Sequence, residues 1–105
     1  MKIARVIGSV TGTIKDGRLV GQKLLVVDIV DASGAVLKPS QVVTDTCGAG
    51  TGDIVLLASG SAARIPPETS GVPTDETAVM LVEAITVNNQ QTYQANSDLR
   101  GLNHG

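Results

Sequence analysis

The chain has 105 residues, a formal net charge of −2, one cysteine and an aromatic content of 1%. This length fits one small domain. The weak negative charge, without any run of basic residues, excludes a surface that attracts nucleic-acid backbones. With no Phe or Trp the core must be aliphatic, and so thin a core is expected to gain further burial by oligomerisation.

Cysteine use and hydropathy indicate the compartment. Cys47 is alone, so no disulfide can form within the chain, which favours a reducing environment. The first residues, MKIARVIGSV, lack the apolar segment of a signal peptide. No apolar run approaches the roughly 20 residues of a membrane span. We therefore expect a soluble cytoplasmic protein that makes no membrane contact.

Short apolar runs separated by turn residues predict strands in the first part of the chain. Residues 3–10 form the first predicted strand, and a turn with Asp-Gly at its centre follows at residues 15–18. Residues 23–30, KLLVVDIV, give the strongest strand signal, and residues 31–34 form the turn after it.

The middle of the chain continues the same alternation of apolar runs and turn residues. Pro39 and Ser40 are expected to interrupt the backbone before a short strand at residues 41–44. Two further apolar runs, at residues 54–58 and 78–87, predict two more strands.

The remaining segments complete a predicted all-β fold. Residues 65–76 hold three prolines and read as a loop, preceded by one short helical turn at residues 61–64. About five to six strands favour a small OB-like β-barrel, because closure removes exposed strand edges. We expect the barrel domain to span residues 1–93 and a polar tail to follow at residues 94–105.

The segment CGAGTGDIVLLASGSAAR, residues 47–64, has a glycine density that raises the question of phosphate binding. The spacing of Gly48, Gly50 and Gly52 matches neither the dinucleotide fingerprint nor the P-loop, and Asp53 adds a negative charge where phosphate would sit. We therefore expect no cofactor here, and glycines that permit a tight turn or a close backbone approach.

Catalytic and metal-binding residues are also not indicated. The sole histidine, His104, is the penultimate residue of the polar tail, so nothing is expected to activate Cys47 as a nucleophile. Asp28 and Asp31 lie three residues apart and would point to opposite faces of a strand. The prediction is no catalytic residue, no metal site, no cofactor and no enzyme activity.

An OB-like barrel leaves open an alternative function as a binding module for a small ligand or single-stranded nucleic acid. Such sites stack bases on aromatic side chains in a basic groove. Tyr93 is the only aromatic residue, and the net charge is negative. The composition therefore argues against nucleic acid and favours a structural role.

The segment CGAGTGDIVLLASGSAAR resembles the signature of the EutN/CcmL family, the pentameric vertex proteins of bacterial microcompartment shells. The opening MKIARVIGSVTGTIK with KLLVVDIVD is similar to the family's first two strands, and Thr44-Asp45 precedes the glycine loop as the family pattern expects. Pro73-x-Asp75 followed by AVMLVEAI resembles its closing section. The resemblance covers about residues 1–87.

Two features depart from the family pattern. Ile54 stands where the family often carries an aromatic residue, which affects packing and not function. The tail beyond Tyr93 has no counterpart in the family pattern, so no role is assigned to it.

The resemblance implies a structural shell protein that acts without chemistry. It would form a cyclic homopentamer that caps the five-fold vertices of a metabolosome or carboxysome. Its neighbours would be hexameric shell proteins, and it would lie in the shell inside the cytoplasm.

The resemblance also implies roles for particular residues. Gly48, Ala49 and Gly50 would form a loop near the five-fold axis around a narrow pore, the alternative being a tight turn away from that axis. Small residues and two charged residues would form the subunit interface: Gly60, Ser61, Ala62, Ala63, Arg64 and Asp75. Arg64 would bind a carboxylate or carbonyls across the interface, the alternative being an ordinary solvated arginine.

Overall fold

The computed structural model describes residues 1–11, 23–59 and 76–95, and all regular secondary structure in these segments is β-strand. None of the described segments forms a helix that is long and apolar enough to cross a membrane. The helical turn predicted at residues 61–64 lies outside them. The strands are β1 (Lys2–Val10), β2 (Lys23–Val30), β3 (Val36–Asp45), β4 (Ile54–Ser59), β5 (Glu76–Leu81), β6 (Ala84–Val87) and β7 (Gln90–Gln94).

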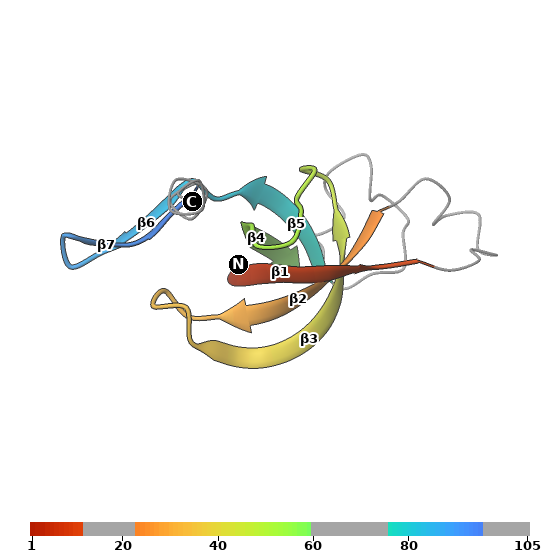
Figure 1. The fold of residues 1–105 in the computed structure, drawn as a ribbon, viewed down its shortest axis with the longest axis horizontal. Helices are drawn as coiled ribbons and strands as arrows, with labels where there is room; N and C mark the ends of the chain where they lie inside the picture. Colours follow the sequence, from red (N-terminus) through yellow and green to blue (C-terminus); the bar gives the residue numbers. More distant parts are fainter. Residues whose placement is uncertain (12–22, 60–75, 96–105) are drawn as a thin grey trace, which may run out of the picture.

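Five of these strands close into a barrel in the order β1-β2-β3-β5-β4, which confirms the predicted all-β barrel (Figure 1). Neighbouring strands run antiparallel, except that β3 meets β5 in a short parallel contact, Thr44 with Thr77 and Asp45 with Ala78. β1 pairs with β2 on one side and β4 on the other, so the N-terminal strand holds two parts of the barrel together.

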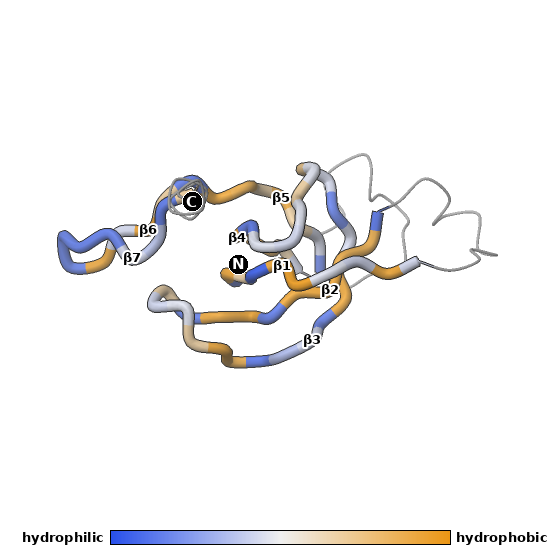
Figure 2. Tube along the Cα trace, viewed as in Figure 1, coloured by the Kyte–Doolittle hydropathy of each residue, from blue (hydrophilic) through white to orange (hydrophobic). Residues whose placement is uncertain are grey.

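The barrel interior is filled by aliphatic side chains, as the composition predicted. Residues alternate between buried and less buried along β1 and β2, because successive side chains of a strand point to opposite faces. Figure 2 shows hydrophobic residues running along β2 and β5. The buried cluster consists of Ala4, Val6, Leu25, Val27, Ile29, Val43, Ala49, Val55, Leu57 and Ala78.

The predicted interruption at Pro39 and Ser40 is wrong, because β3 continues through both residues. Ser40 takes a positive φ of 55° and its amide donates to the Asp28 carboxylate at 3.0 Å. The register with β2 shifts at this point, so the chain forms a β-bulge that accommodates a residue lacking an amide donor. The first five residues of β3 are exposed.

The apolar run at residues 78–87 forms two strands and not the single one predicted. The Val82 amide donates to the Ile54 carbonyl at 2.9 Å, and the chain then leaves the barrel. β6 and β7 make a separate two-stranded hairpin (Figure 1). Its turn residues Asn88 and Asn89 have φ values of 52° and 64°, as a type I′ turn requires. β7 was not predicted as a strand.

Candidate functional site

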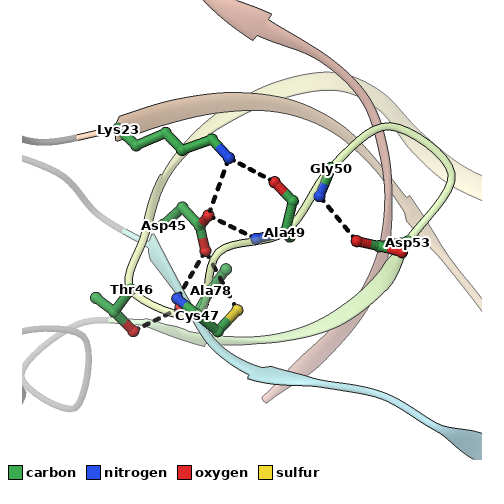
Figure 3. A network of polar contacts seen from close by, with 8 residues as sticks. All are labelled: Lys23, Asp45, Thr46, Cys47, Ala49, Gly50, Asp53 and Ala78. Atoms are coloured by element: carbon green, nitrogen blue, oxygen red, sulfur yellow. Dashed lines mark hydrogen bonds and ion pairs between the residues drawn. The ribbon is translucent and has the colours of Figure 1, made fainter.

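The glycine-rich loop between β3 and β4 is organised by one buried carboxylate, that of Asp45 at the end of β3 (Figure 3). The Asp45 side chain is 1% exposed. Its Oδ1 accepts the Cys47 amide at 2.9 Å, and its Oδ2 accepts the Ala49 amide at 2.8 Å. A short acidic side chain that bonds amides two and four residues ahead folds the chain back on itself, so Asp45 shapes the first half of the loop.

Lys23, from the start of β2, closes this arrangement from the other side. Its Nζ donates to the Ala49 carbonyl at 2.7 Å and lies 3.7 Å from the Asp45 Oδ2 (Figure 3). A buried carboxylate is costly unless it is paired and hydrogen-bonded, and here the cation and two amides provide both. The loop is thereby tied to a neighbouring strand as well as to its own.

Asp53 organises the second half of the loop. Its Oδ2 accepts the Gly50 amide at 2.8 Å, and its amide donates to the Gly50 carbonyl at 3.0 Å. The Gly52 amide donates to the Val6 carbonyl, and the Val6 amide donates to the Asp53 carbonyl, both at 2.9 Å. The Gly50 amide, which a phosphate cradle would need as a donor, is therefore already bonded within the loop.

The three glycines of the loop have different local requirements. Gly48 and Gly52 have φ values of 76° and 95°, a region that glycine reaches without steric cost. Gly50 does not have a positive φ, and a Cβ built there would come no nearer to another group than 3.9 Å, from the Asp53 Oδ2. Among the described residues, nothing therefore requires glycine at Gly50.

The residues predicted to face a pore do not share one environment. Gly48 and Gly50 are exposed, whereas Ala49 is completely buried and belongs to the barrel core. Only the two glycines of this trio therefore present their surface to solvent.

The residues predicted to form the subunit interface lie outside the described residues: Gly60, Ser61, Ala62, Ala63, Arg64 and Asp75.

Sequence reasoning missed the polar residues that organise the loop. The sequence indicates Asp45 only as part of a family pattern, Asp53 only as a charge that opposes phosphate binding, and Lys23 only as a strand residue. The available signal was an acid on each side of the glycine run, since aspartate next to glycine is typical of side chains that bond their own turn.

Cys47 is half-buried beside Asp45, with its Sγ 3.2 Å from the carboxylate Oδ1. Burial first, and then the Asp45 carboxylate, raise the pKa of the Cys47 thiol to about 12. At neutral pH the thiol is protonated, and the protonated form is a poor nucleophile. Across the described part of the chain, no three His, Cys, Asp or Glu side chains gather where they could hold a metal ion.

Comparisons with known proteins place this barrel and loop in context. The sequence model of the family described as "Ethanolamine utilisation protein EutN/carboxysome" matches residues 1–83. The chain is 36% identical over 93 residues to the carboxysome shell vertex protein CcmL of Synechococcus elongatus, covering 89% of this chain and 94% of the relative. It is 34% identical over 93 residues to the bacterial microcompartment shell vertex protein EutN of Salmonella typhimurium, with the same coverage of both chains.

A solved structure shows the same similarity in three dimensions. The GrpN pentameric microcompartment shell protein from Rhodospirillum rubrum superposes with a TM-score of 0.72 at 38% identity. The superposition covers 83% of this chain and 99% of that one.

Proposed function

We infer the function of this chain from its family: it belongs to the EutN/CcmL family of microcompartment shell vertex proteins. It is a structural shell protein that forms pentamers and caps the five-fold vertices of a bacterial microcompartment. It lies in the shell of that compartment, inside the cytoplasm.

The observation that carries this conclusion is the agreement of sequence and fold over most of the chain. The family match extends over residues 1–83, which include all five barrel strands and the glycine loop. The GrpN pentameric shell protein, whose structure is solved, is also similar to this chain over most of its own length.

The oligomeric state tests the assignment directly. Native mass spectrometry of the purified chain is expected to show a species of five subunits at micromolar concentration. A chain that remains monomeric there would contradict the vertex function.

For its partners, the proposal extends to hexameric shell proteins. A pentamer supplies the curvature that a flat layer of hexamers lacks, so co-expression with such hexamers should give closed shells, and omission of this chain should leave open ones. Electron microscopy of the particles distinguishes the two results.

The function includes no chemical step. The one cysteine carries a thiol held protonated by burial and by Asp45, and the related proteins are structural shell components. The glycine loop is therefore expected to contribute through its shape and not through a chemical reaction.

For the loop, we propose that Gly50 faces the five-fold axis of the ring. The described residues of its own subunit leave room for a side chain there, which supports crowding by neighbouring copies as the reason for glycine. Gly50→Val should leave the barrel folded but weaken the ring, whereas Thr51→Val at the next exposed position should not. A ring structure that places Gly50 far from the axis would exclude this role.

The predicted interface around Arg64 is kept as a further proposal on the strength of the family resemblance. Arg64→Ala should weaken the ring while leaving the barrel's strand content, measured by circular dichroism, unchanged.

A further inference from the structure

Most charged side chains in the described part of the chain have a polar partner. Eight of them take part in a hydrogen bond or ion pair: Lys2, Arg5, Lys23, Asp28, Asp31, Asp45, Asp53 and Glu76. Two are left over among residues 1–11, 23–59 and 76–95, namely Lys38 and Glu83, and both are exposed. Among the described residues, one cation and one anion thus remain without a partner.

Lys38 lies on an exposed apolar part of β3. In this strand Val36, Leu37 and Val42 are 49%, 65% and 56% exposed. β3 pairs with β5 only at Thr44 and Asp45, so its first half has no strand on that side within the described residues. Successive side chains of a strand point to opposite sides, so Val36 and Leu37 lie on opposite sides of this segment. We call the exposed segment Val36–Val42, with both of its sides, the β3 face.

Glu83 lines an apolar groove that is built by β1, β4, β5 and the start of β6. The groove has a volume of about 470 Å³, and its other lining residues are Ile3, Leu56, Met80, Leu81, Val82, Ala84 and Ile85. Figure 2 shows hydrophobic residues continuing from β5 toward β6, and Figure 1 shows the first half of β3 curving away on the opposite side of the fold. We call this surface the β5–β6 groove.

We propose that in the ring the β3 face of one subunit docks against the β5–β6 groove of the next copy, with Lys38 beside Glu83. The inference rests on the proposed pentamer and names the surfaces that build it. A ring with cyclic symmetry requires two different, complementary faces on each subunit. The β3 face and the groove both expose apolar side chains, lie apart on one chain, and carry opposite charges that have no partner among the described residues.

The ion pair defines the register of this contact and the apolar residues provide its burial. Removing the apolar side chains of both surfaces from water supplies the main driving force. Complementary charges at the rim of an interface select the correct partner orientation, and like charges brought together there strongly disfavour it.

Charge reversal tests the contact. In the Lys38→Glu variant, two negative charges meet at the contact with Glu83 of the neighbouring copy. In the Glu83→Lys variant, two positive charges meet at the contact with Lys38. Each variant is expected to raise the concentration at which the ring dissociates by about tenfold or more. The double variant restores opposite charges and should return the ring toward the wild-type value. Sedimentation velocity over a dilution series measures all three.

Controls separate interface effects from folding. Both side chains are exposed, so circular dichroism and the melting of dilute protein should be unchanged in each variant. Ser9→Glu adds a negative charge at an exposed position of β1 that belongs to neither surface, and should leave dissociation unchanged.

Cross-linking gives an independent readout of the same contact. In a Cys47→Ser background, a chain carrying both Lys38→Cys and Glu83→Cys should react with a short bismaleimide to give a ladder of up to five linked subunits. Each single cysteine should leave monomers, because the two sites lie on different faces.

The outcomes separate this inference from the proposed function. A wild-type pentamer that both reversals leave intact, or a double variant that stays dissociated, would overturn the Lys38–Glu83 contact and leave the vertex function standing. A wild-type chain that never forms a ring would overturn the vertex function itself.

Discussion

Asp45 is the residue on which the glycine loop depends most. One carboxylate accepts two backbone amides and lies beside Lys23, which in turn holds the Ala49 carbonyl. Ala49 is thereby fixed with its side chain in the barrel core. The charge of a single buried group therefore links the loop's shape to the packing of the barrel.

Replacing this carboxylate should loosen the loop. Asp45→Asn keeps the size of the side chain but removes one acceptor and the negative charge opposite Lys23. Hydrogen bonds to charged groups contribute about 1.5–3 kcal/mol each, so the free energy of unfolding in urea should fall by roughly 2–3 kcal/mol. Hydrogen exchange at the amides of Cys47 and Ala49 should accelerate.

Asp31→Asn is the matched control for this change. Asp31 accepts the Ser33 and Ala35 amides in an exposed turn, where asparagine serves almost as well. The substitution should therefore change the unfolding free energy by less than about 1 kcal/mol. If both variants lowered the free energy of unfolding by the same amount, the burial of Asp45 would not add to its contribution to stability.

The Cys47 thiol predicts how stability depends on alkaline pH. Burial and Asp45 raise its pKa from 9.0 to about 12, so between these values the folded chain holds a proton that the unfolded chain has lost. The contribution to stability is complete below pH 9 and is lost as the pH rises toward 12. Urea unfolding at several alkaline pH values should show a steeper decline for the native chain than for Cys47→Ser.

At the scale of elements, the β6–β7 hairpin stands apart from the barrel. None of its residues is buried, and its sequence from Ala84 to Ala95, AITVNNQQTYQA, contains no charge. The Thr92 hydroxyl donates to the Ala32 carbonyl at 2.6 Å, and the Ala95 amide donates to the Glu83 carbonyl at 2.8 Å. An isolated two-stranded hairpin is only marginally stable in water, so the Thr92 contact with Ala32, the Ala95–Glu83 bond at the base of the hairpin and the I′ turn all help to hold its order.

The turn of this hairpin can be removed without touching the barrel. Asn88→Pro forces φ to about −65° where the chain has 52°, so the β6–β7 pairing should be lost. Because no residue of the hairpin is fully buried, the unfolding free energy of the barrel should change by less than about 1 kcal/mol. NMR chemical shifts of residues 84–94 report the loss.

Asn89→Gly is the opposite control, since Asn-Gly is the strongest sequence for a type I′ turn. It should retain or strengthen the pairing. A large drop in barrel stability in the proline variant would show that the hairpin is part of the core unit.

The elements that could be predicted were those whose pattern is local. β1, β2 and β4 follow from their apolar runs, and the turn at the glycine loop follows from its glycines. The continuity of β3 could not be predicted, because Pro39 and Ser40 are turn residues and their bulge depends on Asp28 in another strand. The division between β5 and β6 depends likewise on the Val82 amide bonding Ile54.

The same distinction holds for the candidate site. Gly48 and Gly52 meet a local requirement for a positive φ, and such a requirement can be predicted from the sequence. The pairing of Lys23 with Asp45 joins residues that only the β2–β3 register brings together. Pairings of this kind cannot be predicted from local sequence patterns, because they depend on how distant strands align.

For the whole molecule, an aliphatic barrel with exposed apolar surfaces links stability to assembly. Leu37, Val42, Met80 and Leu81 remain exposed in a single subunit. Burying them in a ring stabilises the folded chain by mass action, since the unfolded chain does not assemble.

The midpoint of thermal unfolding should therefore rise with protein concentration. A tenfold increase should stabilise each subunit of a pentamer by about 1 kcal/mol, which corresponds to roughly 4–8 °C for a domain of this size. Scanning calorimetry at three concentrations measures the slope. A midpoint that does not move with concentration would mean that the subunits unfold independently of the ring.

The position of β1 between β2 and β4 also determines the order in which the chain can fold during synthesis. β1 can pair with β2 as soon as Val30 has emerged, but its other edge waits for β4, where Lys2 meets Leu57 and Arg5 meets Ile54. Contacts between residues so far apart in sequence close slowly, and an open strand edge can pair with other chains while it waits. Barrel closure is thus the late step of folding: after its first strand has found its second partner, a subunit still needs β5 to pair with both β3 and β4 before it can join its neighbours.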